Sequence, residues 1–289
     1  MSILVTGASG TIGSLVVQGL AAAGAQVDAF VRKPGKQPFP AGVKEVVGDL
    51  TDVASLRAAL SSVRTLFLLN AVTPDEVTQA LVALNLARDA GIERIVYLSV
   101  IHADRYTNVP HFTGKHTVER MLESLAMPAT ILRPAYFMQN DLTIQQVIRD
   151  HGVYPMPIGS AGVAMVDTRD IADIAVAELL RRDAAPAPLP RLTLDLVGPE
   201  ALTDASVAKT WATALGREVT HGVTDLAAFE QQVASFGPAW LAYDMRLMMA
   251  GIQKIGMLAD AGGVDRLQTI LGRPLRTYAA LVSEAVKAA

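Results

Sequence analysis

Three glycines, Gly7, Gly10 and Gly13, follow the apolar run Ile3-Leu4-Val5 at regular intervals. A strand that ends in such a turn and passes into a helix presents backbone N–H groups at the positive end of the helix dipole, where a pyrophosphate binds. Gly7 permits the tight turn, Gly10 the approach of the phosphates and Gly13 the packing of the helix on the strand. The predicted cofactor contacts from this turn are Gly7, Ser9, Gly10, Thr11, Ile12 and Gly13.

The context of the turn strengthens this prediction, because glycine also occurs in ordinary turns. The turn follows an expected strand, precedes an expected helix and leads to a second strand at residues 26–31. In NAD sites an acidic residue about 20 positions further on binds the ribose diol. This chain has Arg32 and Lys33 there. Because a guanidinium fork suits a phosphate, the sequence predicts NADP(H) in preference to NAD(H); the alternative is a solvated loop end.

Asp49 and Leu50 follow the third expected strand, residues 43–47. From this position we expect Asp49 to reach the adenine and Leu50 to pack on it. Asp49 is equally compatible with a role as the cap of the helix that follows.

The elements that must position these residues alternate along the first half of the chain. Short β-branched runs predict strands at 2–6, 26–31, 43–47, 65–69, 94–98 and 129–133. Apolar residues at three- and four-residue spacing predict helices at 11–23, 53–61, 75–90 and 113–125. Such alternation indicates an α/β fold of the Rossmann type, a doubly wound parallel sheet with helices on both faces.

The alternation changes near residue 150, where a loop or short strand is followed by a helix at 168–181 and a strand at 191–197. The rest of the chain is expected to be mainly helical. We therefore predict a Rossmann domain at 1–155, to which segments within 163–198 return, and a smaller substrate-binding domain at 156–289. The methionine-rich stretch 240–258 is expected to pack in a core or an interface rather than to line a substrate pocket.

Composition excludes several classes of protein. The 289-residue chain carries a net charge of −3, so no broad basic surface for nucleic acid is expected. Neither a membrane-spanning run nor a signal sequence is evident, which favours a cytoplasmic protein with no membrane partner. The absence of cysteine removes disulfides and thiolate nucleophiles, and no cluster has metal-ligand spacing. The expected partner is a small-molecule substrate; the chain can be a monomer or a homodimer.

The ligand of an open parallel sheet lies beyond the carboxyl ends of the strands. The residues that follow those ends and are predicted to contact the cofactor are Asn70, Ala71, Val72, Ser99 and Tyr136. By position, residues 70–72 are expected near the ribose on the nicotinamide side, and Tyr136 near the nicotinamide ring. The alternatives are turn roles for Asn70 and Ser99 and interface packing for Tyr136.

Six stretches carry a family resemblance: residues 5–13 (VTGASGTIG), 48–50 (GDL), 96–99 (VYLS), 115–119 (KHTVE), 130–140 (TILRPAYFMQN) and 272–278 (GRPLRTY). In these the chain resembles the NmrA-like family of atypical short-chain dehydrogenases, with isoflavone-reductase-like and quinone-reductase-like relatives. The resemblance implies an NAD(P)-binding fold with a small helical substrate domain. The family contains reductases and also regulators that bind the nucleotide without turning it over.

Short-chain dehydrogenases usually supply the proton for reduction from a tyrosine one helical turn before a lysine. At that spacing this chain has His111 and Lys115. A histidine can donate a proton near neutral pH, and Lys115 can hold the ribose hydroxyls or, as in isoflavone-reductase-like relatives, act as the acid–base group. Both are predicted to be catalytic, and Lys115 also to bind cofactor. The alternatives are an ordinary loop residue for His111 and a solvated cation for Lys115.

The leading hypothesis is an NADPH-dependent oxidoreductase of the NmrA-like type that transfers hydride to a small apolar carbonyl, quinone or conjugated acceptor. The alternative is a non-catalytic NADP(H)-sensing regulatory protein, for which the missing tyrosine is the motive. A nucleotide-sugar epimerase is disfavoured because the Tyr-x-x-x-Lys pair is absent.

Overall fold

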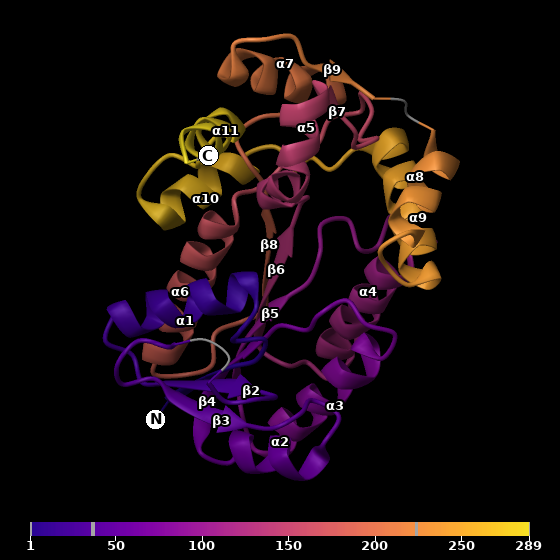
Figure 1. Ribbon diagram of the computed structural model, residues 1–289. Coiled ribbons are helices and arrows are strands. Elements are labelled where there is room, and N and C mark those ends of the chain that lie inside the picture. Colours follow the sequence, from indigo (N-terminus) through magenta and orange to yellow (C-terminus); the bar gives the residue numbers. More distant parts are fainter. Residues whose placement is uncertain (1, 36–37, 223–224, 289) are drawn as a thin grey trace.

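A computed structural model describes residues 2–35, 38–222 and 225–288. Its main feature is a seven-stranded parallel sheet with the strand order β3-β2-β1-β4-β5-β6-β8 (Figure 1). The strands are β1 (Ser2–Val5), β2 (Val27–Val31), β3 (Lys44–Val47), β4 (Val63–Leu68), β5 (Arg94–Leu98), β6 (Ala129–Pro134) and β8 (Leu192–Leu196). The predicted Rossmann-type fold is confirmed.

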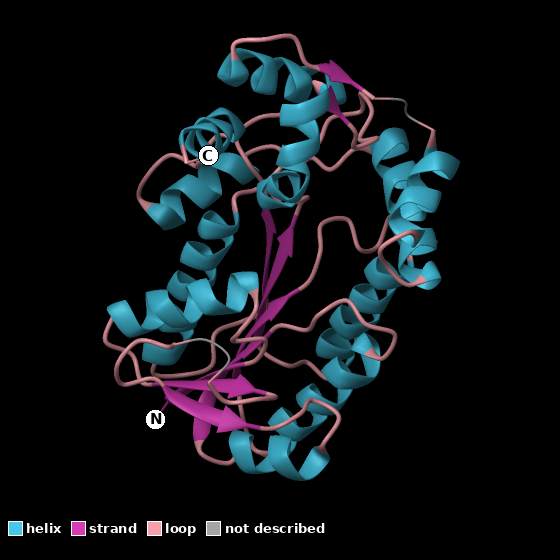
Figure 2. Cartoon of the chain, in the orientation of Figure 1, coloured by secondary structure: helices cyan, strands magenta, loops and turns pink. Residues whose placement is uncertain are grey.

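Helices cover both faces of this sheet, as parallel strands require, because each connection must cross over a face. On one face α1 (Thr11–Ala22) packs against α6 (Thr168–Ala184). On the other face lie α2 (Val53–Leu60), α3 (Glu76–Asp89) and α4 (Pro110–Ser124). Figure 2 shows the twisted sheet with helices on either side of it. Each face therefore has its own apolar core.

The order of the strands reverses at β1. Ile3 of β1 pairs with Val27 of β2 on one side and with Thr65 of β4 on the other. The connections from β1 run first to one edge of the sheet and then back to the other, so the loops after β1 and β4 diverge. This divergence opens a crevice at the carboxyl ends of the strands.

The remaining elements form the mainly helical C-terminal region that we expected. They are η1 (Met138–Ile144), α5 (Gln145–His151), α7 (Asp204–Leu215), α8 (Leu226–Ala234), α9 (Ala239–Ile255), α10 (Gly263–Leu271) and α11 (Tyr278–Lys287), with β7 (Val153–Tyr154) paired to β9 (Thr220–His221). Between these elements the chain returns to the sheet through α6 and β8. The division of the chain at residue 155 stays a prediction.

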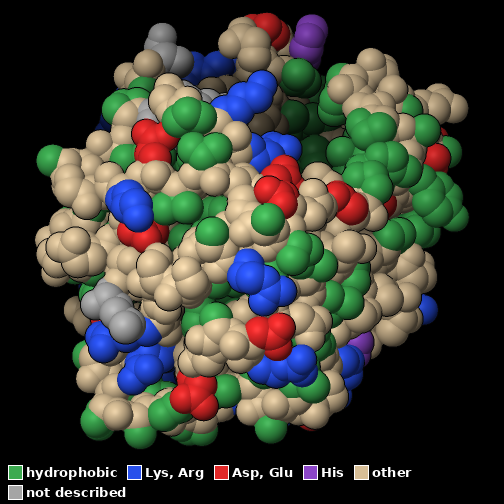
Figure 3. Space-filling view, turned by 90° about the horizontal axis from the view of Figure 1, so that it is seen from below, with side chains coloured by type: hydrophobic (Ala, Val, Ile, Leu, Met, Phe, Trp, Pro, Cys, Tyr) green, Lys and Arg blue, Asp and Glu red, His purple; other side chains and the backbone are tan. Residues whose placement is uncertain are grey.

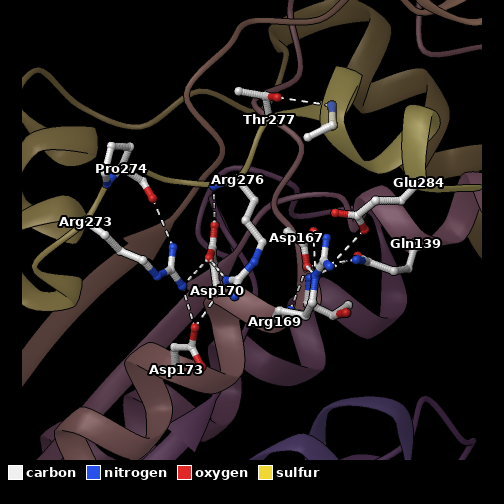
Figure 4. A network of polar contacts seen from close by, with 12 residues as sticks. Gln139, Asp167, Arg169, Asp170, Asp173, Arg273, Pro274, Arg276, Thr277 and Glu284 are labelled. Carbon is white, nitrogen blue, oxygen red and sulfur yellow. Dashed lines mark hydrogen bonds and ion pairs between the residues drawn. The ribbon is translucent and has the colours of Figure 1, made fainter. Parts of the chain in front are cut away.

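Buried carboxylates fasten the C-terminal segment to α6 (Figure 4). Asp170, with a side chain 1% exposed, accepts a hydrogen bond from the backbone N–H of Arg276 at 2.8 Å and pairs with the guanidinium groups of Arg273 and Arg276. Asp167, fully buried, accepts from Arg169 at 2.7 Å and from the Gln139 amide at 2.8 Å. A buried carboxylate is stable only when it is paired. Asp170 therefore fastens the segment before α11 to α6, whereas Asp167 joins the start of α6 to η1.

One face of the molecule shows how its surface charges are distributed. Charged side chains of both signs are interspersed over the face shown in Figure 3. No helix within the described ranges has the length and the apolar character needed to cross a membrane.

A buried polar cluster lies where four C-terminal elements meet. Asp141 of η1 is fully buried and accepts hydrogen bonds from the hydroxyl groups of Tyr278 at 2.6 Å and Tyr154 at 3.2 Å. The Tyr278 hydroxyl in turn accepts from the Trp211 indole at 2.9 Å. Burial raises the pKa of Asp141 to about 7, although the tyrosine hydrogen bonds oppose this shift. The carboxyl group therefore remains protonated in the native protein at pH values where it is ionised in the unfolded chain.

We expect Asp141→Asn to change how stability depends on pH. In the unfolded chain an aspartate ionises near a pKa of about 3.9. Between that value and about 7 the native state binds the extra proton, so Asp141 lowers the free energy of unfolding as pH rises through this window, by up to about 4 kcal/mol. The asparagine variant should lose this decline, as measured by urea unfolding at several pH values.

Asp89 on α3, with a side chain that is 50% exposed, provides the matched control. Asp89→Asn should retain the wild-type pH dependence. An unchanged decline in Asp141→Asn would contradict the assignment of the pH dependence to this cluster.

Candidate active site

A cavity of about 580 Å³ opens at the carboxyl ends of the strands, within the range of small-molecule sites. The helix α9 closes one side of it through Met245 and Met248. Most predicted site residues line this cavity: Gly7, Ser9, Gly10, Thr11, Ile12, Arg32, Asp49, Leu50, Asn70, Ala71, Val72, Ser99, His111, Lys115 and Tyr136. Gly13 and Lys33 are predicted site residues that do not line it.

The glycine turn brings backbone close to backbone. Gly7 has φ +61°, a left-handed conformation that glycine adopts without strain. A Cβ atom on Gly13 would lie 2.1 Å from the Gly7 carbonyl oxygen, so only glycine fits there. No side chain in the described part of the chain caps the N-terminus of α1. The first-turn N–H groups of this helix are therefore available to an anion in the cavity.

The Thr6 side chain joins the start of the glycine turn to the segment that follows β4, a role that the sequence did not reveal. Its hydroxyl donates to the Leu69 carbonyl oxygen at 3.0 Å and accepts from the Leu69 N–H at 2.8 Å. These bonds join the chain just beyond the ends of β1 and β4, next to the backbone hydrogen bond from the Thr6 N–H to the Phe67 carbonyl oxygen. The crevice between the two strands therefore has a rigid base.

At the expected adenosine end, Arg32 follows β2 and lines the cavity, whereas Lys33 is exposed outside it. Asp49 accepts from the hydroxyl and the backbone N–H of Thr51 at 2.6 and 2.8 Å, and these hydrogen bonds lower the pKa of the Asp49 carboxyl. The cap of α2 is Asp52, which accepts from the Ala54 N–H. The alternative that Asp49 caps this helix is wrong, because two aspartates precede it and the one immediately adjacent takes the position.

Asn70 presents an unused acceptor to the cavity. Its side-chain nitrogen donates to Gln79 Oε1 at 3.3 Å, whereas its Oδ1 is buried with no hydrogen-bond partner among the described residues. Buried polar atoms are rarely left unpaired. A ligand hydroxyl or amide that donates to Oδ1 would satisfy it.

Ser99 and Tyr136 also line the cavity, but their polar groups have protein partners or deep burial. The Ser99 hydroxyl donates to Glu119 Oε1 at 2.5 Å, and Arg133 Nε donates to the same carboxylate at 3.0 Å. Burial raises the pKa of Tyr136 well above its usual range. Neither hydroxyl is therefore placed as a ready acid at neutral pH.

Lys115 is held by a partner that sequence reasoning missed. Its Nζ lies 2.6 Å from Oε1 of Glu76 on α3, and both side chains are less than a tenth exposed. Nζ also lies 3.4 Å from the Leu98 carbonyl oxygen at the end of β5. The ion pair fixes the ammonium group at the cavity wall.

His111 lies in the first turn of α4, not in a loop before the helix. The helix begins at Pro110, three residues before the predicted start, because proline favours the first helical position. Asp244 of α9 accepts from the His111 backbone N–H at 3.2 Å through Oδ1, and its Oδ2 contacts the ring Nδ1. The Asp244 side chain is fully buried. No local signal in the sequence points to this partner, 133 residues further on.

Methionines form the wall opposite the turn. Met245, Met248 and Met257 line the cavity, whereas Met249 and Ile252 are buried in the core. The stretch therefore packs as expected and also lines the pocket. Among the described residues no group of His, Asp or Glu side chains could hold a metal ion.

The comparisons with known proteins agree with this geometry. The model of the NmrA-like family matches residues 1–266. An NAD(P)H azoreductase of Xenophilus azovorans is 33% identical over 96% of this chain and 95% of its own. Quinone oxidoreductase 2 of Escherichia coli is 30% identical over 97% of both. The structure of an NADPH-dependent quinone oxidoreductase complexed with NADPH, also from Escherichia coli, superposes with a TM-score of 0.85 at 26% identity, covering 98% of this chain and 99% of that one.

Two glycine variants should separate cofactor binding from folding. In Gly10→Ala the new Cβ lies 3.2 Å from the Gly7 carbonyl oxygen, a tight contact that small shifts relieve. The methyl group would stand where the phosphates approach, so we expect NADPH affinity to fall at least about tenfold while the melting temperature changes little. Calorimetric titration and thermal unfolding measure the two effects.

Gly13→Ala is the matched variant, and we expect it to lower the stability of the fold more than the affinity for NADPH. Its Cβ overlaps the Gly7 backbone, so α1 must move from β1, at a cost of about 1–3 kcal/mol. Equal NADPH affinity in Gly10→Ala and the wild type would contradict the placement of the phosphates at this turn.

Proposed function

The chain belongs to the NmrA-like family, and we propose that it is an NADPH-dependent reductase that transfers hydride to a small apolar carbonyl, quinone or conjugated acceptor. The observation that carries the proposal is one cavity whose lining includes the glycine turn at the start of α1, three methionines, and His111 and Lys115 of α4. Two relatives of nearly equal length, named as an azoreductase and a quinone oxidoreductase, support it.

The residues present fit a dinucleotide. The close backbone approach at Gly7 and Gly13 leaves the N-terminus of α1 open to the pyrophosphate, and the unpaired Asn70 Oδ1 suits a ribose hydroxyl or an amide. Arg32 at the end of β2 would hold the 2′-phosphate, which is our reason for proposing NADP(H) over NAD(H). When bound, the nicotinamide supplies hydride.

Reduction of a carbonyl or quinone leaves negative charge on the acceptor oxygen. His111 and Lys115 are four residues apart and so lie on the same face of α4. The Lys115 ammonium, anchored by Glu76, would stabilise that charge without needing to move. The methionine wall would exclude water and accept flat apolar molecules of varied outline, because methionine side chains adapt their shape.

The predicted domains divide these tasks in our proposal. Residues 1–155, with the returning segments of 163–198, would hold the cofactor. Residues 156–289 would supply most of the acceptor pocket through α9 and Met257.

Purified protein should oxidise NADPH in the presence of at least one quinone, azo compound or enone. The fall in NADPH absorbance, against a control without acceptor, measures this activity. Calorimetry run alongside separates two failures. NADPH binding without turnover of any acceptor would favour the non-catalytic regulatory alternative, and absence of binding would overturn both.

Arg32→Ala should raise the KM for NADPH by about 10- to 100-fold, because a charge-assisted hydrogen bond contributes about 1.5–3 kcal/mol. The KM for NADH should stay the same, since NADH has no 2′-phosphate. Lys33→Ala is the control, and its effect should be smaller because Lys33 lies outside the cavity lining. Equal losses for NADPH and NADH in Arg32→Ala would contradict the assigned preference.

A further inference from the structure

Asp244 is a fully buried carboxylate that contacts the candidate acid by both of its oxygens. Oδ1 accepts from the backbone N–H of His111 at 3.2 Å, and Oδ2 contacts Nδ1 of the same residue. The bond to the backbone fixes the Asp244 carboxylate relative to α4. The contact with Nδ1 then fixes the His111 ring relative to this carboxylate. Because a carboxylate only accepts hydrogen bonds, Nδ1 must carry the proton in this contact.

The second ring nitrogen of His111, Nε2, is free of the contact with Asp244. His111 lines the cavity, and its Nε2 has no hydrogen-bond partner within residues 2–35, 38–222 and 225–288. The ring is also packed edge-on against Phe112, with centroids 4.7 Å apart. With Nδ1 and the ring plane both fixed, Nε2 is the group that can exchange a proton with a ligand.

The other charged groups near the ring are less suited than His111 to exchange a proton with a ligand. The nearest ionisable side chain on α4 that also lines the cavity is Lys115, and its ammonium is paired with Glu76 of α3. This contact directs the Lys115 ammonium group to Glu76. Asp244 itself is fully buried and lies on the far side of the ring from Nε2.

We propose that Asp244 is the positioning residue that holds His111 with its Nδ1 protonated, so that Nε2 delivers the proton to the acceptor oxygen during reduction. The proposal rests on the proposed function. For a carbonyl acceptor, a bound NADPH would give up hydride from its nicotinamide C4–H bond and become NADP+, the hydride would form the new C–H bond, and the C=O π pair would move to oxygen. His111 acts in its doubly protonated form: its Nε2–H bond breaks as the O–H bond of the product forms. His111 is left neutral with its remaining proton on Nδ1, the tautomer from which Asp244 can accept, and a proton from solvent restores the lost one.

Asp244 lies on the same helix as two of the methionines that line the cavity. Met245 and Met248, which line the acceptor pocket, lie within one turn of Asp244 on α9. The helix that shapes the acceptor pocket therefore also orients the acid on α4. An acceptor that repositions α9 changes the contact that aims His111.

The test is Asp244→Asn, measured in the full-length protein. The asparagine oxygen can still accept the His111 N–H, which places its NH₂ group beside Nδ1. Neutral His111 must then carry its proton on Nε2, and transfer from that tautomer would leave an imidazolate. We expect kcat to fall by about 100-fold, the scale of general acid catalysis, with the Kd for NADPH unchanged.

Nitrogen-15 NMR of histidine-labelled protein gives a readout that does not depend on turnover. His111→Gln identifies the His111 signals by their loss. The wild type should show His111 protonated on Nδ1, and Asp244→Asn should show the neutral ring protonated on Nε2. The double variant should lose no more activity than either single variant, because both remove one function.

Two further variants guard against misfolding. Asp265→Asn, at an exposed position on α10, should match the wild type in kcat and in the NMR signals. If Asp244→Asn fails to fold, His111→Gln keeps Asp244 bonded to the backbone and should show the same loss of kcat. Wild-type kcat in His111→Gln, or an unchanged His111 tautomer in folded Asp244→Asn, would overturn the proposal. Absence of turnover in the wild type would defeat the proposed function, whereas the tautomer would still decide whether Asp244 sets the ring.

Discussion

The close packing of α1 on the end of β1 is the constraint on which the site depends. Gly13 lies so near the Gly7 carbonyl that a Cβ atom would be 2.1 Å from it, and Gly7 itself takes a left-handed conformation. With no side chain between helix and strand, the N-terminus of α1 points into the crevice where the strand order reverses. The proposed anion site, and with it the direction that we propose for the cofactor, depend on this one close approach.

Paired charges carry the rest of the site, because isolated buried charges are unstable. Lys115 is paired with Glu76, Arg133 with Glu119, and the ring of His111 with Asp244. The first and third pairs join side chains from different helices. The same contacts that offset the cost of burial therefore also fix the geometry of the polar groups, and a site fixed in this way does not need to reorganise during reaction.

The features of the fold that could be predicted from the sequence are those that depend on neighbouring residues. The glycine turn, the strands and most helices depend on residues close together in the sequence, and these predictions are confirmed to within a few residues. The helix α4 begins three residues before the predicted start, at Pro110, although this proline is itself a local signal. Glu76 and Asp244 could not be found, because each acquires its role only when distant helices pack. Nothing in the sequence near Asp244 distinguishes it from the exposed Asp265.

Binding and chemistry thus rest on different parts of the polypeptide. The proposed phosphate site uses backbone groups, whose direction is set by the fold and by a few glycines, so we expect it to tolerate change in the surrounding side chains. The proposed acid–base groups are side chains whose orientation depends on partners from distant elements, and α9 carries both Asp244 and two methionines of the proposed acceptor wall. Substitutions on α9 therefore act on two properties at once, the shape of the acceptor pocket and the orientation of His111. If the cofactor site is fixed by the fold as we propose, this helix is where acceptor range and catalytic efficiency would be adjusted together.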